Sequence, residues 1–130
     1  MADKKFFVCE RCGNIVGLIH EGGGVLTCCG QPMKALEPNT TDAAKEKHVP
    51  AVTVEGTLIK VQVGETAHPM AEDHYIQWIY LQTEHGGQRK ALKPGDAPCA
   101  EFVVTGDKPV SVYAYCNKHG LWMAPVVIPE

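Results

Sequence analysis

Four cysteines near the start of the chain constrain its fold more than any other feature. They are Cys9, Cys12, Cys28 and Cys29. A segment as short as residues 6–36 buries little apolar surface and usually needs a metal or a cross-link for stability. The Cys-x-x-Cys-Gly spacing of the first pair is typical of a metal knuckle, in which glycine permits a tight turn and backbone amides point at the sulfurs. We therefore predict a small metal-bound β module at residues 1–36.

The second pair is unusual because Cys28 and Cys29 are adjacent. Two adjacent residues that bind one ion cannot both adopt relaxed geometry, so we expect a distorted tetrahedral site. A redox-inert zinc site gains nothing obvious from this distortion, whereas it could alter the potential and the spectrum of an iron site. The pair therefore favours iron.

The overall composition is that of a globular chain. Of its 130 residues, 45% are hydrophobic, which is enough for a packed core. The formal net charge of −3 does not indicate the basic surface that binds nucleic acids. No apolar run is long enough to span a bilayer, and the first residues lack the features of a signal peptide. We expect a cytoplasmic protein without a membrane or nucleic-acid partner. In that reducing compartment, the six cysteines are expected to be metal ligands or redox groups.

After the small module, residues 37–47 are polar and turn-prone and predict a linker with at most one helical turn. Beyond it, apolar residues alternate in about seven short segments separated by turn signals, which predicts an antiparallel β-sandwich. The segments are 52–63 (two strands), 74–81, 88–92, 100–105, 110–116 and 122–128. The predicted class is all-β, with the small module followed by a seven-stranded immunoglobulin-like sandwich at residues 48–130.

A second group of chemically competent residues lies at the edges of the predicted strands. Cys116 and His119 are three positions apart at a strand end, and Cys-x-x-His gives one metal a soft and a borderline ligand. Three more histidines lie at element edges, where a sandwich gathers its loops: His48, His68 and His74. The other two lie beside glycine turns and are expected to be solvated: His20 and His85.

Four imidazoles and one thiolate suggest a five-coordinate site for iron, copper or zinc. Catalytic zinc usually has three protein ligands, so zinc rarely needs so many. If the imidazoles lie in a plane with the thiolate axial, one face stays open and the thiolate pushes electron density toward it. Such a ferrous site favours the reduction of a small oxygen species.

These segments, in this order, resemble a known family. The four-cysteine module resembles desulforedoxin. Four later segments resemble neelaredoxin: Glu46–Pro50, His68–Met70, His74–Ile76 and Cys116–Gly120. Together they resemble the desulfoferrodoxin family of two-iron superoxide reductases, and the resemblance covers nearly the whole chain.

The resemblance implies roles for these residues. The four cysteines would hold one non-haem iron, and His48, His68, His74 and His119 would be equatorial ligands of a second, with Cys116 axial. Glu46 would occupy the open position in the oxidised state, and Lys47 would attract superoxide and help to hold its bound water. The product would be hydrogen peroxide without dioxygen, the electron donor rubredoxin or a similar carrier, and the assembly a homodimer. Cys99 is no ligand in this pattern and is expected to be an ordinary, partly exposed thiol.

Two other interpretations stay open. A cupredoxin-type electron-transfer module could bind copper through Cys116, His119, Met123 and one upstream histidine. It leaves two histidines and the Glu46–Lys47 pair unexplained. A zinc-stabilised interaction protein without chemistry is the second alternative. Metal analysis separates the three, since they require two irons, one copper, or zinc alone.

Overall fold

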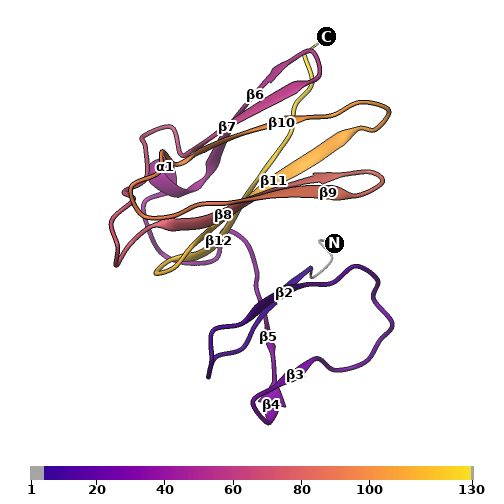
Figure 1. Cartoon of the computed structure of the whole chain (residues 1–130), viewed down its shortest axis with the longest axis vertical. Coiled ribbons are helices and arrows are strands. Elements are labelled where there is room, and N and C mark those ends of the chain that lie inside the picture. The colour runs from indigo at the N-terminus through magenta and orange to yellow at the C-terminus, as the bar shows by residue number, and fades with distance from the viewer. Residues whose placement is uncertain (1–4, 130) are drawn as a thin grey trace. The chain divides into compact units, whose positions relative to one another are not determined.

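The computed structural model describes residues 5–129, so residues 1–4 and 130 of the predicted domains lie outside the described part. The chain falls into two compact units, Met1–Glu37 and Pro38–Glu130, which are described separately (Figure 1). Within the described residues, no helix is long and apolar enough to cross a membrane.

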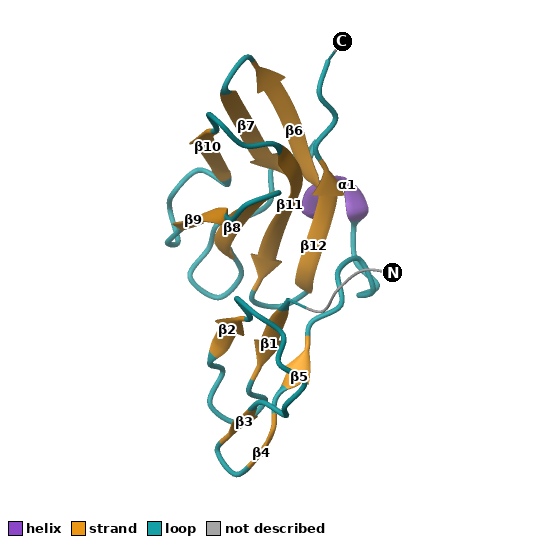
Figure 2. Ribbon diagram, turned by 90° about the vertical axis from the view of Figure 1, so that its right-hand side faces the viewer, coloured by secondary structure: helices purple, strands orange, loops and turns teal. Residues whose placement is uncertain are grey.

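The first unit is built from short strands around one small sheet. β1 (Phe6–Val8) is central and pairs antiparallel with β2 (Ile15–Gly17) and β5 (Lys34–Ala35) (Figure 2). A separate hairpin joins β3 (Thr27–Cys28) to β4 (Gln31–Pro32). Among the described residues of this unit, two apolar side chains are buried, those of Phe6 and Cys9. So small a core is consistent with a unit that depends on its cysteine cluster.

The second unit is a sandwich of two antiparallel sheets that follows the single helical turn α1 (Lys45–His48). One sheet has the strand order β10-β7-β6 and the other β12-β11-β8-β9 (Figure 1). The described residues of this unit form seven strands: β6 (Pro50–Glu55), β7 (Leu58–Val63), β8 (Ile76–Thr83), β9 (Gly87–Ala91), β10 (Cys99–Val103), β11 (Pro109–Cys116) and β12 (Gly120–Pro125). The predicted all-β class is confirmed, and so are the seven strands.

The core of the sandwich explains why these segments form strands. Alternating side chains point between the sheets and are almost completely buried, as for Ile79 and Leu81 of β8, Phe102 of β10 and Val112 of β11. Fully burying a side chain of this size contributes about 1.5–3 kcal/mol, so the alternation decides which face of each strand turns inward.

The strand register brings several loops to one end of the sandwich. Pro50, the first residue of β6, pairs with Val63, the last residue of β7. Cys116, the last residue of β11, pairs with Ile76 of β8 and with Gly120 of β12. The segments before β6, between β7 and β8, and between β11 and β12 therefore meet at the same end.

Candidate metal centres

The first unit gathers its four cysteines into one cluster. Their sulfur atoms all lie within 4.8 Å of one another. The Cys12 and Cys28 sulfurs are 3.6 Å apart, and those of Cys28 and Cys29 are 3.9 Å apart. The backbone N–H of Cys12 points at the Cys9 sulfur at 3.5 Å, as expected of the knuckle. A set of four thiols at this spacing suits iron or zinc.

Cys28 ends β3, and Cys29 begins the tight turn that leads to β4. Cys29 has φ of 52° and Gly30 has φ of 77°, so both are in the left-handed region that suits a two-residue hairpin. For cysteine this conformation is strained, which is the backbone counterpart of the distortion expected for adjacent ligands.

The thiols differ in how readily they lose a proton. Backbone hydrogen bonding, mainly from Cys12, lowers the pKa of Cys9 to about 6. Contact with the Cys12 thiol, and then with Cys28, raises the pKa of Cys29 to about 12. Without a metal, the four thiols therefore do not all lose their protons readily. A bound cation favours the four thiolates, which are the form that ligates a metal.

The second unit gathers its four edge histidines and one cysteine at the end of the sandwich described above. His48 ends α1, His68 and His74 lie between β7 and β8, Cys116 ends β11, and His119 lies in the following turn. One ligand atom from each lies within 4.8 Å of those from the others. His48, His68 and Cys116 are buried. The structure thus brings together all five residues that the sequence suggested as ligands.

The four imidazole rings form a closed square. Neighbouring ring centroids are 4.6 Å apart for His48 and His68, 4.7 Å for His68 and His74, 5.0 Å for His74 and His119, and 4.9 Å for His119 and His48. Adjacent ring planes are nearly perpendicular, with angles of 77–83°. The opposite rings of His48 and His74 are 6.5 Å apart, close to the diagonal of a flat square. Such an arrangement fits four nitrogens around one ion.

Hydrogen bonds orient two of these rings. Nδ1 of His48 lies 2.7 Å from the carbonyl oxygen of Ala44, and Nδ1 of His68 lies 2.7 Å from that of Pro69. A ring nitrogen beside a carbonyl donates its proton to it, which leaves Nε2 unprotonated as a ligand atom. The two Nε2 atoms are 3.2 Å apart.

The environment also favours neutral rings. Burial lowers the pKa of His68 to about 4, and burial is the main cause that lowers the pKa of His48 and of His74. Nε2 of His74 is buried and has no hydrogen-bond partner among the described residues. A buried nitrogen without a partner is costly, and metal ligation would satisfy it. This atom is the clearest sign that the cluster fits a metal.

Cys116 supplies the one sulfur of this cluster. Its side chain is fully buried, and burial raises the pKa of the thiol. The backbone N–H groups of Lys118 and His119 oppose that effect, because hydrogen bonds favour the thiolate. The sulfur lies 3.9 Å from Nδ1 of His119. A buried thiolate with two amide donors is a suitable metal ligand.

Two supporting residues were not singled out from the sequence. The Asn117 side chain accepts a hydrogen bond from the Tyr75 N–H at 2.9 Å and donates one to the Asp73 carbonyl at 3.0 Å. Trp122 is fully buried, donates to the carbonyl of His119 at 3.0 Å, and packs its ring 4.9 Å from that of His48. Their signal in the sequence was only proximity to the Cys-x-x-His segment.

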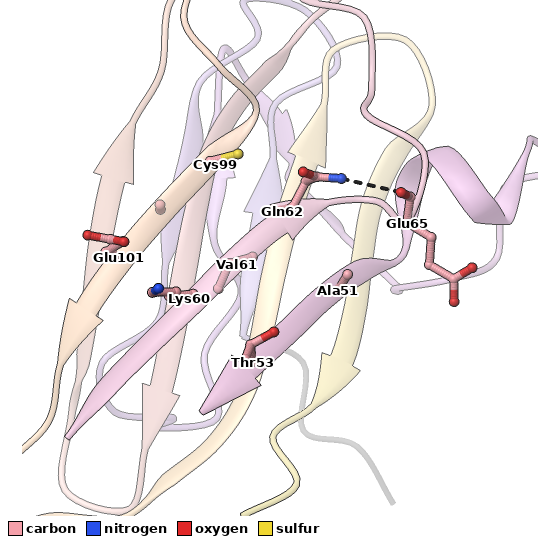
Figure 3. Close-up of a pocket in the computed structure, with 9 residues that line it drawn as sticks. Ala51, Thr53, Lys60, Val61, Gln62, Glu65, Cys99 and Glu101 are labelled. Atoms are coloured by element: carbon pink, nitrogen blue, oxygen red, sulfur yellow. Dashed lines mark hydrogen bonds between the residues drawn. The ribbon is translucent and has the colours of Figure 1, made fainter. Parts of the chain in front are cut away.

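The remaining predicted residues lie outside both clusters. Glu46 and Lys47 are exposed in α1, directly before His48, and within the described part of the chain the cluster does not include Glu46. Glu46 lines a small hollow of about 380 Å³ together with Lys45 and Glu65. Cys99 is exposed and lines a second hollow of about 390 Å³ on the outer face of the β10-β7-β6 sheet (Figure 3).

Comparisons with known proteins match both units. The family model for desulfoferrodoxin matches residues 40–125, and that for the desulfoferrodoxin N-terminal domain matches residues 2–36. A desulfoferrodoxin homolog from Archaeoglobus fulgidus is 55% identical over 91% of this chain and 94% of its own. Desulfoferrodoxin from Nitratidesulfovibrio vulgaris is 51% identical over 92% and 94%. The crystal structure of superoxide reductase from Treponema pallidum is 38% identical, covers 95% of this chain and 99% of its own, and has a TM-score of 0.79.

Proposed function

The chain belongs to the desulfoferrodoxin family, and we propose that it reduces superoxide to hydrogen peroxide at the cluster of four histidines and Cys116. The enzyme is an oxidoreductase of the superoxide reductase type, and its family has two iron centres. The comparisons do not support the cupredoxin-type alternative. The observation that carries the proposal is the square of imidazoles, with a buried thiol as the fifth donor.

In this proposal each cluster holds one iron. Cys9, Cys12, Cys28 and Cys29 bind the first. The second is bound by the four ring nitrogens and the Cys116 sulfur, since imidazole and thiolate together suit iron. A ferrous ion held by these five residues would supply one electron, with which superoxide and two protons give hydrogen peroxide and no dioxygen. The protein contributes neutral imidazoles and a buried thiolate, which raises the electron density of the metal.

Two charged residues next to this site, Lys47 and Glu46, have different roles in the proposal. The net charge of −3 disfavours long-range attraction of superoxide, so a local cation is required. Lys47 provides it, one residue before His48. Burial is the main cause that lowers the pKa of His48. The Lys47 ammonium lowers this pKa further, whereas the Glu46 carboxylate raises it. Both residues directly precede His48 in α1. Glu46, two residues before His48, would supply a carboxylate ligand to the oxidised iron.

The second part of the proposal concerns the partners. Rubredoxin or a similar small carrier returns the electron. The chain forms a homodimer through its first unit, where Val16, Ile19 and Val25 are exposed and β2 and β5 are sheet edges. Exposed apolar side chains and open edges favour self-association. Light scattering at micromolar concentration should give twice the mass of the chain, and a monomer would contradict the dimer.

Pulse radiolysis across a salt series tests the role of the two charges. Lys47→Ala should slow the encounter with superoxide and weaken its salt dependence, because screening acts over a Debye length of about 8 Å at physiological ionic strength. Glu46→Ala should leave the encounter rate nearly unchanged and alter the ferric spectrum. The matched control is Lys108→Ala, which removes an exposed lysine next to the start of β11, at the opposite end of that strand from Cys116. If Lys47→Ala behaves like Lys108→Ala, the steering role is wrong.

A further inference from the structure

The helical turn α1 has little stability of its own. It contains four residues, and its N-cap is Ala44, whose side chain cannot accept a hydrogen bond from the first turn. Helices this short do not form in isolation, because nucleation costs more than one or two backbone hydrogen bonds return. The position of α1 must therefore be determined by neighbouring segments. This matters because α1 carries two charged residues and a metal ligand.

The segment that follows β7 provides this support. Gly64 lies so close to α1 that a Cβ atom there would be 2.7 Å from the Glu46 carbonyl oxygen and 2.9 Å from that of Val49. The backbone N–H of Thr66 donates to the same Glu46 oxygen at 2.9 Å. Real Cβ atoms do not approach backbone atoms this closely, so only glycine permits the contact. The φ of Gly64 lies outside the left-handed region, which makes the requirement one of space.

A side chain from β7 holds the same segment from the other side. Nε2 of Gln62 donates to the carbonyl oxygen of Gly64 at 2.8 Å and to that of Glu65 at 3.3 Å. Figure 3 shows the Gln62 side chain reaching toward the Glu65 backbone, while the Glu65 carboxylate points away. Three residues after Glu65, the N–H of His68 donates to the Val63 carbonyl oxygen at 2.7 Å. The segment 62–68 thus begins on the sheet, contacts α1 and ends at a ligand.

We infer that Gly64 and Gln62 are positioning residues, which set α1 against the second metal centre and so place Glu46, Lys47 and the His48 ring. The inference rests on the proposed function for its catalytic consequence, because only there do the two charges act on superoxide. The contact itself does not depend on that function. A displacement of about 1 Å at a reacting site can lower a rate by about 100-fold. A small shift of α1 after loss of its contact with Gly64 is therefore enough to lower the rate.

The test compares three variants of the iron-loaded protein. Gly64→Ala introduces the Cβ that α1 cannot accommodate. Gln62→Ala removes the side-chain bonds without adding an atom. The matched control is Gly86→Ala, because a Cβ at Gly86 has no neighbour within 4 Å among the described residues and its φ is not left-handed. The three readouts are hydrogen exchange of segments 44–50 and 63–67 by mass spectrometry, the ferric absorption of each centre, and the rate with superoxide at low and high salt.

For Gly64→Ala we expect exchange in 44–50 to become about tenfold faster or more, because α1 loses its support. The absorption of the second centre should shift, while that of the first centre stays unchanged as an internal control. The rate at low salt should fall and its salt dependence should weaken. Gln62→Ala should change the same readouts in the same direction by less, and Gly86→Ala should change none.

The inference is overturned if both Gly64→Ala and Gln62→Ala keep wild-type exchange in 44–50 and a wild-type second absorption band. A lower urea midpoint with an unchanged band would also overturn it, since this is the result of a merely structural role. If Gly64→Ala does not fold, the result for Gln62→Ala decides whether the inference holds. That variant is expected to fold, because it only truncates one half-buried side chain. If the wild type does not react with superoxide, the proposed function fails, while exchange and absorption still decide the positioning role.

Discussion

Asn117 offers the sharpest test of how the second centre is held together. Its side chain joins the Cys-x-x-His turn to the loop of His74 through two hydrogen bonds, one with the Tyr75 N–H and one with the Asp73 carbonyl. Each such bond contributes about 1 kcal/mol net, so Asn117→Ala should lower the free energy of unfolding of the second unit by about 2 kcal/mol. Part of this loss arises because the Tyr75 N–H is left without its acceptor.

Urea unfolding of the iron-loaded protein measures this change, with the ferric absorption of the second centre and far-ultraviolet circular dichroism as probes. A loss of about 2 kcal/mol lowers the ratio of folded to unfolded protein by roughly 30-fold. The matched control is Gln88→Ala. Gln88 is exposed on β9 and makes a single side-chain bond to the backbone, from Nε2 to the Val103 carbonyl at 2.9 Å. Gln88→Ala should lower the free energy of unfolding by about 1 kcal/mol or less.

The ferric band of Asn117→Ala should also shift, because the loop that carries His74 loses its tie to the turn, whereas Gln88→Ala should keep the wild-type band. The reasoning would be refuted if both variants unfolded at the same urea concentration. It would be refuted equally if Asn117→Ala lost stability but kept the band unchanged, because the two bonds would then stabilise the fold without orienting a ligand.

Three further predictions concern single residues. Cys12→Ser should remove or loosen the first iron while the second stays bound, because the clusters lie in separate units; metal analysis and visible spectra check this, and joint loss of both irons would contradict it. Cys116→Ser should abolish superoxide reduction and the sulfur-to-iron absorption of the oxidised second centre, and an unchanged band would exclude the thiolate ligand. Hydrogen bonds, first from Thr83 and then from His85 and the Lys108 N–H, lower the pKa of Asp107 from 3.8 to about 2. A carboxyl with a lowered folded-state pKa contributes stability that is present above pH 3.8 and lost as the pH falls toward 2. Asp107→Asn should therefore flatten the fall in unfolding free energy over that interval in urea titrations.

The fold was largely predictable because the core of the sandwich repeats a local pattern. From Ile79 onward in β8 and from Val112 onward in β11, every second residue is buried, and this period of two can be recognised within a single strand. The strand bounds were less accurate. The predicted strand 74–81 spans Ile76–Thr83 instead, because His74 pairs with Ala71 through two backbone hydrogen bonds and not with a neighbouring strand. The last strand spans Gly120–Pro125 rather than 122–128, because its pairing with β11 starts at Gly120 and ends at Pro125.

The ligand candidates were predictable for a different reason. Cysteine and histidine are rare enough that their spacing and their places at strand ends stand out, and the family resemblance assigned them roles. The supporting residues had no such signal. Asn117 acts through Tyr75, 42 positions away, and Gly64 acts through the backbone of Glu46. Both contacts depend on the register of strands that only the folded sandwich brings together, so no local pattern contains them.

The ligands on the two sides of the second centre are attached to elements with different structural support. Cys116 ends a strand that pairs on both sides, with β8 and with β12, and its side chain is fully buried. His48 ends a single helical turn supported mainly by a neighbouring loop. Local unfolding begins in the least stable elements of a structure. We therefore expect the centre to loosen first at His48. The residues proposed to handle anions, Glu46 and Lys47, belong to that more compliant side, whereas the thiolate is attached to the rigid one. In the proposed function, the side of the centre that admits superoxide and releases hydrogen peroxide is the movable one, and the side that supplies the thiolate is the fixed one.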